Sequence, residues 1–378
     1  MKAAIYNTLG SGGGAHLAAA RLQYGLTDVK FPIDHVTLDL TKPHEKGVFF
    51  LNVALDRVLK KIFFRKNDIY HSSNLFALRQ NLSKYDTINL HWFSNGLVSF
   101  RQLLEFKGNL VLTCHDSWLA CGFEHHAKMG VFSNRLMDRY LFEKKAAVVR
   151  KAKAVVLPSE WQMAVYQERF PDVSHFSVIP NICGQEFVDS SKIPKKSSSN
   201  NNLRTIGVVA NKLFQNPAKG AKNYREFFAI LDAAQTRCRV QVAGRHSEAD
   251  REISKTYKYL EFGFLGELDE EQMFRFYNEI DLLVHLSNFE NLSNVLVESR
   301  FHSLPAIALD VGGNSEILTT CHDFLIPPGL IAQCRDILND LVVRNNGDPT
   351  EIRAVYEAKF SNKMILKKYM DILNGNAP

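Results

Sequence analysis

The sequence predicts an α/β protein with two doubly wound, parallel-sheet domains of the Rossmann type that face each other across a cleft. At 378 residues the chain exceeds the usual size of one core, so two domains are expected. Short apolar runs alternate with longer periodic stretches, which indicates repeated β-α units around a parallel sheet. Residues 189–203 are rich in Ser, Lys and Asn and separate two similar series of such units.

The first series of apolar runs supplies the strands of an N-terminal domain, for which we expect residues 1–183. Each run is short and is bounded by polar residues or glycine, which is typical of a buried strand. A glycine turn after the first run leads into a helix over residues 15–26. The expected strands are residues 2–7, 87–91, 109–113, 154–158 and 176–179.

The second series follows a solvated linker over residues 184–203 and forms a C-terminal domain over residues 204–355. Its expected strands are residues 204–210, 239–243, 282–286 and 306–309, and residues 356–378 form a last helical segment. Doubly wound sheets bind ligands at the carboxyl ends of their strands. We therefore expect the functional residues at those ends.

Charge and composition narrow the class of partner. The chain has 46 Lys and Arg against 40 Asp and Glu, and the net charge of +6 suits an anionic partner such as a nucleotide phosphate, a nucleic acid or an acidic lipid. No nucleic-acid recognition motif is present, so nucleic acid is not expected. The first residues lack the pattern of a secretory signal, so none is expected, and no apolar run reaches about 20 residues. The six cysteines lack zinc-site spacing, which predicts reduced thiols in a metal-free, cytoplasmic protein.

A glycine cluster joins the first expected strand to the first helix. Gly12, Gly13 and Gly14 belong to a Gly-Ser-Gly-Gly-Gly turn, whose backbone N–H groups can approach an anion at the positive end of a helix dipole. The spacing is not Gly-x-Gly-x-x-Gly, because Ala15 stands where the third glycine would fall. The alternative interpretation is a simple tight turn.

Two glutamates follow the strand expected at residues 282–286. Glu290 should lie in the loop beyond the strand, and Glu298 along the next helix. A loop carboxylate and a helix carboxylate can hold two different hydroxyl-bearing parts of one ligand, while the helix N-terminus between them receives phosphates. The alternative is an acidic helix cap at Glu290, with Glu298 on a solvated face.

These residues also carry a family resemblance. The run Ser287-Asn-Phe-Glu-Asn-Leu-Ser-Asn-Val-Leu-Val-Glu298, with Leu304-Pro305 and the segment 311–316 after it, resembles the signature of the retaining, metal-independent family-4 glycosyltransferases of the GT-B fold. The segment 112–118, which contains His115, resembles the Thr-x-His-Asp-x-Trp element of polysaccharide-assembling members. The other matching pieces are the glycine cluster, Ser159-Glu-Trp, residues 178–181 and Lys219-Gly220.

The resemblance implies a role for each matching residue. Glu298 would hydrogen-bond the ribose of a nucleoside diphosphate sugar, Glu290 would contact the transferred sugar, and Lys219 would neutralise the diphosphate. His115 would lie near the donor sugar, and residues Asn291, Leu292, Ser293 and Asn294 would surround sugar and phosphate with their backbone. No cofactor is implied beyond the nucleotide sugar, which is a co-substrate. The acceptor would be a glycan or a lipid-linked sugar. In this fold the last helix often crosses back to the first domain.

The chain departs from the family pattern in two places. Family members usually carry an Arg about six residues before the Lys, where this chain has Asn211 and Lys212. Either Lys212 supplies a second cation for the donor, or Asn211 binds the donor differently. Ser303 stands where a glycine usually precedes the next strand.

A basic amphipathic helix is expected over residues 51–66. Leu51, Leu55, Val58, Leu59 and Ile62 share one face at helical spacing, while Arg57, Lys60, Lys61 and Arg65 lie largely off it. Such a helix suits peripheral contact with an anionic membrane, on its cytoplasmic face. The alternative is a helix packed on the core with a solvated basic face.

Three functional classes therefore remain. A glycosyltransferase fits the paired glutamates and the family resemblance. A nucleotide-sugar epimerase of the same fold would release its product without an acceptor, and a dinucleotide oxidoreductase is disfavoured by the missing glycine fingerprint. A non-catalytic assembly protein of the same fold is the third class, because fold does not fix function.

Overall fold

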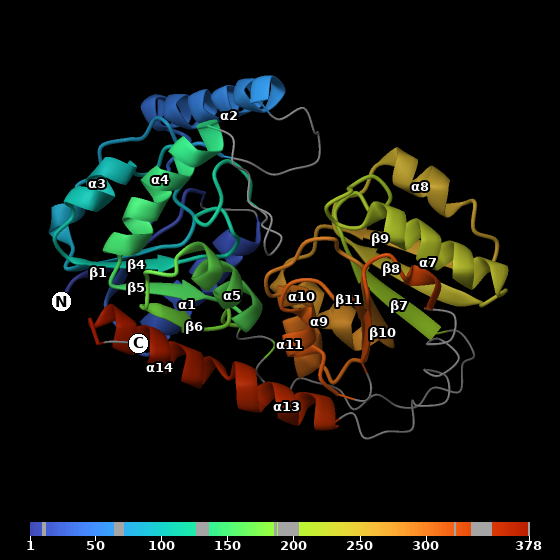
Figure 1. Cartoon of the computed structure of the whole chain (residues 1–378). Helices are drawn as coiled ribbons and strands as arrows, with labels where there is room; N and C mark the ends of the chain where they lie inside the picture. The colour runs from blue at the N-terminus through green and yellow to red at the C-terminus, as the bar shows by residue number, and fades with distance from the viewer. Residues whose placement is uncertain are drawn as a thin grey trace. The chain divides into compact units, whose positions relative to one another are not determined.

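The computed structural model describes residues 1–9, 13–63, 72–125, 136–184, 187, 204–320, 323–333 and 350–376. The chain divides into two compact units (Figure 1). The first unit comprises Met1–Ile182 together with Asn362–Pro378, and the second comprises Cys183–Ser361. The expected linker at 184–203 lies outside the described residues, apart from Gly184 and Phe187.

The first unit is built on a six-stranded parallel sheet. Its strands are short apolar runs, and most of their side chains are buried between two helical layers. Their order changes direction between the first and third strands, so the carboxyl ends of these two strands flank a topological switch point. In spatial order the strands are β2 (Ile33–Val36), β1 (Ala3–Tyr6), β3 (Thr87–Leu90), β4 (Asn109–Thr113), β5 (Ala154–Leu157) and β6 (Phe176–Val178).

Helices cover both faces of this sheet, so the unit is doubly wound. On one face α1 (Gly14–Asp28) packs together with α14 (Asn362–Leu373), which returns from the far end of the chain. On the other face lie α3 (Phe100–Glu105), α4 (Leu136–Lys151) and α5 (Glu160–Arg169). Ser99 and Ser159 cap α3 and α5 by accepting hydrogen bonds from backbone N–H groups. A short 3-10 helix, η1 (Leu82–Lys84), precedes β3.

The second unit contains another six-stranded parallel sheet, in the Rossmann strand order. Its strands are β12 (Phe324–Ile326), β11 (Ala306–Leu309), β10 (Leu282–His285), β7 (Arg204–Val209), β8 (Cys238–Ala243) and β9 (Leu260–Gly266). α7 (Ala221–Ala233) packs on one face, and α9 (Glu270–Glu279), α10 (Asn294–Phe301) and α13 (Thr350–Phe360) pack on the other. The remaining elements are α8 (Glu248–Ser254), α11 (Asn314–Ile317) and η3 (Ile331–Gln333).

The predicted fold class is confirmed: both sheets are parallel and both are covered by helices on their two faces. Every strand expected from the sequence is present, within one or two residues. The strands that the sequence did not predict are β2, β9 and β12, and all three lie at sheet edges. The returning segment begins at Asn362 rather than at residue 356, because α13 ends at Phe360 and packs on α10 in the second unit.

Helix α2 (Pro43–Phe63) does not bury the apolar face that the sequence predicts. Leu59 is buried and Leu55 half-buried, but Leu51, Val58 and Ile62 are exposed. The inner face is held by polar contacts instead. Asn52 donates to the backbone oxygen of Phe76 at 2.9 Å, and Asp56 accepts from the backbone and hydroxyl of Ser73. Residues 64–66 of the expected helix lie outside the described residues.

Several properties bear on environment and metal binding. Cys114, Cys121, Cys183 and Cys238 are buried free thiols, and Cys321 and Cys334 lie outside the described residues. Among the helices that the structure describes, none combines the length and apolar content needed to cross a membrane. Across the same described parts of the chain, no cluster of three or more His, Cys, Asp or Glu side chains could hold a metal ion.

Candidate active site

The switch point of the second unit lies between β7 and β10, where the strand order changes direction. Two loops leave the carboxyl ends of these strands. One runs from β7 to α7 and carries Lys219, and the other runs from β10 to α10 and carries Glu290. A parallel sheet opens its ligand crevice between two such loops. The fold therefore brings together two residues that are 71 positions apart in the sequence.

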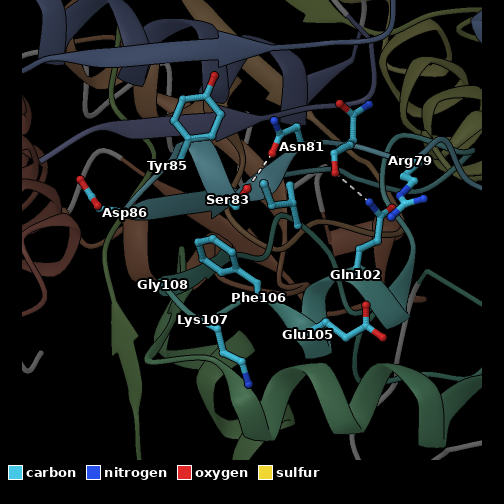
Figure 2. Close-up of a pocket in the computed structure, with 12 residues that line it drawn as sticks. Arg79, Asn81, Ser83, Tyr85, Asp86, Gln102, Glu105, Phe106, Lys107 and Gly108 are labelled. Carbon is cyan, nitrogen blue, oxygen red and sulfur yellow. Dashed lines mark hydrogen bonds between the residues drawn. The ribbon is translucent and has the colours of Figure 1, made fainter.

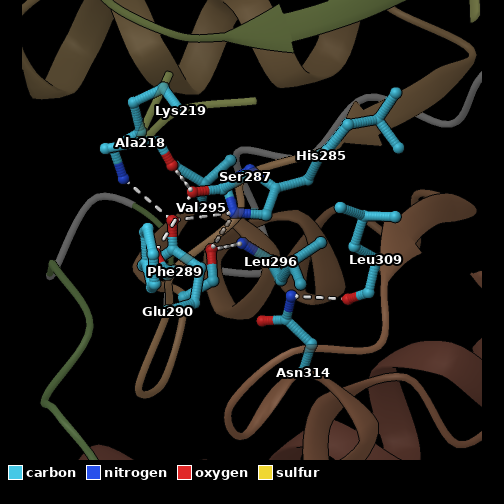
Figure 3. Close-up of polar contacts among 12 residues, drawn as sticks. Ala218, Lys219, His285, Ser287, Phe289, Glu290, Val295, Leu296, Leu309 and Asn314 are labelled. Carbon is cyan, nitrogen blue, oxygen red and sulfur yellow. Dashed lines mark hydrogen bonds and ion pairs between the residues drawn. The ribbon is translucent and has the colours of Figure 1, made fainter. Parts of the chain in front are cut away.

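Lys219, Glu290 and His285 form one polar group at this point (Figure 3). The Lys219 Nζ lies 2.8 Å from Glu290 Oε1, and the His285 Nε2 lies 3.2 Å from the same oxygen. Burial favours the neutral acid, but Lys219 and His285 outweigh it and hold the pKa of Glu290 below its ordinary value. The carboxylate is thus ionised and compensated by a cation that is itself 41% exposed.

Glycines at two positions allow the loops around this polar group to approach one another closely. Gly220 has a left-handed φ of 81°, and a Cβ there would lie 1.8 Å from the backbone oxygen of Leu286. Gly312 has a φ of 59°, and its Cβ would lie 1.7 Å from the backbone oxygen of Glu290. The neighbouring Gly313 N–H donates to the oxygen of Asn291 at 2.7 Å. Only glycine fits at these two positions.

The N-terminus of α10 lies beside Glu290. The Ser293 hydroxyl caps the helix by accepting from the Leu296 N–H, and it also lies 3.2 Å from His285 Nε2. Asn294 begins the helix, and Leu292 is buried, so it can offer a ligand only its backbone. One turn further, Glu298 is 4% exposed and accepts a hydrogen bond from the Tyr277 hydroxyl at 2.9 Å. The alternative interpretation, in which Glu298 lies on a solvated face, is therefore wrong.

The loop after β7 departs from the family pattern, and the structure explains the asparagine at position 211. The Asn211 Oδ1 accepts from the Arg245 N–H at 2.7 Å, and the Lys212 N–H donates to the Arg245 oxygen at 2.6 Å. Asn211 thus joins two neighbouring loops. Lys212 has a left-handed φ of 53° and an exposed side chain, while the Arg245 side chain pairs with Glu267.

In the first unit, the predicted residues lie at the carboxyl edge of the sheet. Gly13 has a φ of 83° and precedes Gly14, the first residue of α1, while Gly12 lies outside the described residues. His115 follows β4, and its Nε2 lies 2.8 Å from the Nδ1 of His91, which follows β3. Burial lowers the pKa of His115 to about 4. The adjacent Asp116 pairs with His125 at 3.2 Å.

Sequence reasoning missed three polar residues that support the site. His285 and Tyr277 contact the two glutamates, and His91 contacts His115. His285 ends β10 and His91 directly follows β3, so a polar residue at the end of a buried apolar run was the available signal. Tyr277 offered none, because its aromatic ring fits the apolar face of α9 equally well.

A cavity in the first unit lies away from these residues. It has a volume of about 890 Å³ and is lined by residues 79–83, 85–86, 102 and 105–108 (Figure 2). These residues precede β3 and β4, so the cavity lies at the amino ends of the strands, opposite the edge where parallel sheets bind ligands. Its lining mixes Arg79 and Lys107 with Asp86 and Glu105. None of the predicted site residues lines it.

Ser303 occupies the left-handed region, with a φ of 52°, at the position where glycine was expected. A residue with a Cβ pays roughly 1 kcal/mol for that conformation. We expect Ser303→Gly to raise the free energy of unfolding by about 0.5–1 kcal/mol, measured by urea denaturation. Ser174 is exposed and has no positive φ, so Ser174→Gly is the matched control and should not stabilise the protein. Equal effects of the two changes would contradict the strain argument.

Two family models match the chain, one in each half. Residues 12–183 match the model described as Glycosyltransferase Family 4, and residues 204–342 match Glycosyl transferases group 1. The search of curated proteins finds no match.

Solved structures share the fold over the whole chain. Anabaena HepE (Alr3699) in complex with UDP is 16% identical, with a TM-score of 0.62 and coverage of 99% of this chain and 100% of that one. Sucrose-phosphate synthase from Thermosynechococcus elongatus is 16% identical, with a TM-score of 0.67 over 99% and 98%. A variant of S. aureus TarM, in a complex that includes UDP, is 14% identical, with a TM-score of 0.64 over 99% of each chain.

Proposed function

Because the chain belongs to the family-4 glycosyltransferases of the GT-B fold, we propose that it transfers a sugar from a nucleoside diphosphate sugar to a glycan or lipid-linked acceptor. The observation that carries this proposal is the group of Lys219, Glu290 and His285 at the switch point of the second unit. HepE is described in complexes with UDP and with UDP-glucose, which supports a donor of this class.

Each end of the donor finds a matching partner in the second unit. The buried Glu298 carboxylate accepts hydrogen bonds from the ribose hydroxyls, and the N-terminus of α10 with the backbone of residues 291–294 receives the phosphates. Lys219 moves its partially exposed ammonium from Glu290 to the diphosphate, whose charge grows as the sugar leaves. Glu290 then holds the transferred sugar through its hydroxyls. Lys212 is the second cation of the site.

The proposed transfer retains the anomeric configuration and needs no metal ion or cofactor. The acceptor hydroxyl oxygen bonds to the anomeric carbon on the face from which the nucleoside diphosphate departs. The bond from that carbon to the phosphate oxygen breaks, and a phosphate oxygen of the leaving group takes the hydroxyl proton. Lys219 and the backbone N–H groups stabilise the leaving charge.

The first test is mass-spectrometric detection of donor hydrolysis across a panel of nucleotide sugars, beginning with UDP sugars and with EDTA present. We expect slow release of one nucleoside diphosphate, unaffected by EDTA. Glu298→Ala should lower this rate by roughly 100-fold, because the ribose loses its carboxylate partner. Glu279→Ala, a carboxylate change at the exposed end of α9, is the matched control. No release from any donor and no donor-dependent thermal shift would favour a non-catalytic assembly protein.

The same experiment distinguishes a transferase from a nucleotide-sugar epimerase. A nucleotide-sugar epimerase would convert or release its sugar without an acceptor, at a rate that no acceptor changes. A transferase should accelerate when a glycan or lipid-linked acceptor is added and should form a glycosidic product of matching mass. An epimerised sugar formed at a rate that no acceptor changes, with no glycosidic product, would refute the transferase.

We propose that the protein works in the cytoplasm, peripherally attached to the inner membrane face, in polysaccharide assembly. The supporting observation is helix α2, where Phe50, Leu51, Val58 and Ile62 are each about half or more exposed. Arg57 and Lys61 are exposed on the same helix. An apolar surface with adjacent cations matches the headgroup region of an anionic bilayer.

Replacing the apolar residues of α2 should weaken vesicle binding. We expect Leu51→Ser, Val58→Ser and Ile62→Ser together to lower the partition coefficient onto phosphatidylserine vesicles by at least about tenfold, since each buried apolar side chain contributes roughly 1 kcal/mol or more. Co-sedimentation measures this directly. Leu330→Ser, on an equally exposed leucine of the second unit, should leave binding unchanged. If the wild-type protein does not bind the anionic vesicles, the proposed membrane contact is refuted.

A further inference from the structure

A chain of buried polar side chains crosses the core of the first unit and ends at His115. Its members come from α14, from β4 and β3, and from the segments that follow these two strands. Most are almost fully buried: the exposed fraction is 0% for Asn89 and 6% for His91. Burying polar groups costs free energy unless each is hydrogen-bonded. The members, in order, are Tyr369, Thr113, Asn89, His91 and His115.

The orientation of the Asn89 amide in the structure sets the direction of each hydrogen bond along this chain. The Thr113 hydroxyl contacts the Tyr369 hydroxyl and donates to the Asn89 Oδ1 at 2.8 Å. The amide nitrogen of Asn89 then faces His91, with Nδ2 3.2 Å from Nε2. An amide nitrogen only donates, so His91 Nε2 must accept.

The tautomer of His91 determines the direction of its hydrogen bond with His115. A neutral imidazole whose Nε2 accepts carries its proton on Nδ1. The Nδ1 of His91 lies 2.8 Å from the Nε2 of His115, so His91 donates and His115 accepts. The lone pair of His115 Nε2 is therefore occupied, and the ring proton of His115 is on Nδ1.

We propose that this hydrogen-bond chain holds His115 in the neutral tautomer protonated on Nδ1, and that His91 is its positioning residue. The assignment of the tautomer follows from these contacts and from the orientation of the Asn89 amide, whereas its consequence for catalysis rests on the proposed transferase function. In that function His115 is a fixed, neutral polar group and takes no proton from the acceptor. This agrees with the front-face mechanism, in which a donor phosphate oxygen takes that proton. Burial lowers the pKa of both His91 and His115, which is consistent with neutral rings.

The returning helix α14 contributes to this hydrogen-bond chain. Tyr369 lies on α14, far from His115 in sequence, and supplies the first hydroxyl of the chain. Two further hydrogen bonds hold the helix end against the strands: Thr87 donates to the Leu373 oxygen at 2.9 Å, and Asn109 donates to the Ile372 oxygen at 3.0 Å. The strand residues that contact Tyr369 are thereby held in register with it.

A matched pair of substitutions tests the direction of the His91 hydrogen bond. The Nδ2 of asparagine takes the place of the histidine Nδ1, so His91→Asn keeps a donor toward His115. His91→Asp has the same shape but only accepts. Long-range ¹H–¹⁵N spectra of the full chain report which ring nitrogen of His115 carries the proton. We expect Nδ1 protonation in the wild type and in His91→Asn, and Nε2 protonation in His91→Asp.

The rates of transfer should follow the spectra. We expect His91→Asn to retain most of the wild-type kcat and His91→Asp to lose at least roughly tenfold, the usual effect of removing a partner that orients a site residue. If His91→Asp does not fold, Thr113→Val is the second variant. It removes the donor to Asn89 with little change of shape, so signals from both tautomers of His115 should be seen.

Three outcomes would overturn the proposal. Two concern the wild type: protonation of His115 on Nε2, or a doubly protonated His115 ring at neutral pH. The third is identical His115 spectra in His91→Asn and His91→Asp. The spectra require no donor sugar, so they are independent of the transferase assay. The expected spectra from a protein that releases no nucleotide would support the hydrogen-bond chain and refute the proposed function instead.

Discussion

Lys219→Met should lower kcat/KM for sugar transfer by roughly 100- to 1,000-fold, the usual effect of removing one group that stabilises charge in a transition state. The ammonium of Lys219 is the cation that contacts Glu290 at the switch point, and it is exposed enough to reach a ligand. Its loss has a second effect, because Glu290 then keeps only His285 to oppose burial, and the pKa of its carboxyl rises. Initial rates against donor concentration, for the donor identified by the panel, measure the change.

The control for this substitution lies three residues away. Lys222 is exposed on α7, and Lys222→Met removes the same charge from the same helix region without touching the site. It should change kcat/KM by less than about threefold, the size expected of a screened surface charge. A Lys219→Met protein with at least a tenth of wild-type activity would remove Lys219 from the proposed diphosphate site.

Asp323→Ala should lower the free energy of unfolding of the second unit by about 3–5 kcal/mol, because it leaves a buried cation without its partner. The pair of Arg300 and Asp323 is almost completely buried, with both side chains 2% exposed. Arg300 also donates to the backbone oxygen of Leu304, in the turn that follows α10. Urea denaturation, followed by fluorescence and by circular dichroism to detect separate unfolding of the units, measures the loss.

A surface ion pair in the same unit provides the comparison. Arg245 pairs with Glu267 at 3.0 Å, but both side chains are more than 60% exposed. Water and salt screen such a pair, so Glu267→Ala should cost no more than about 1 kcal/mol. If the two substitutions cost the same, burial does not determine the contribution of the Arg300–Asp323 pair.

The central strands could be predicted from sequence because they are buried on both faces, and a strand buried on both faces is a continuous apolar run. β5 (Ala154–Leu157) and β11 (Ala306–Leu309) are examples, with every side chain buried. The edge strands are different. β2 consists of Ile-Asp-His-Val with no residue fully buried, and β9 contains two glycines and a glutamate.

The candidate site was predictable where a residue combines an unusual spacing with a family resemblance. Glu290 and Glu298 satisfy both conditions, whereas Lys219 was predicted from the resemblance alone. The supporting residues do not, because a histidine at a strand end or a tyrosine on a helix is equally common in an ordinary core. The inner face of α2 was missed for another reason. Asn52 and Asp56 are polar, and only tertiary contacts with Phe76 and Ser73 make their burial favourable.

Helix α14 has a consequence for the order in which the chain folds during its synthesis. Ile365, Leu366, Tyr369 and Leu373 share an apolar cluster with residues of β1 and α1, so one face of the first sheet is only partly covered until residues 362–373 have left the ribosome. The second unit ends at Ser361 and has its complete sequence earlier. Domains usually fold in the order of their synthesis. Here the first unit is completed after the second, and a nascent chain stalled before residue 362 would hold a folded second unit and an unfinished first one.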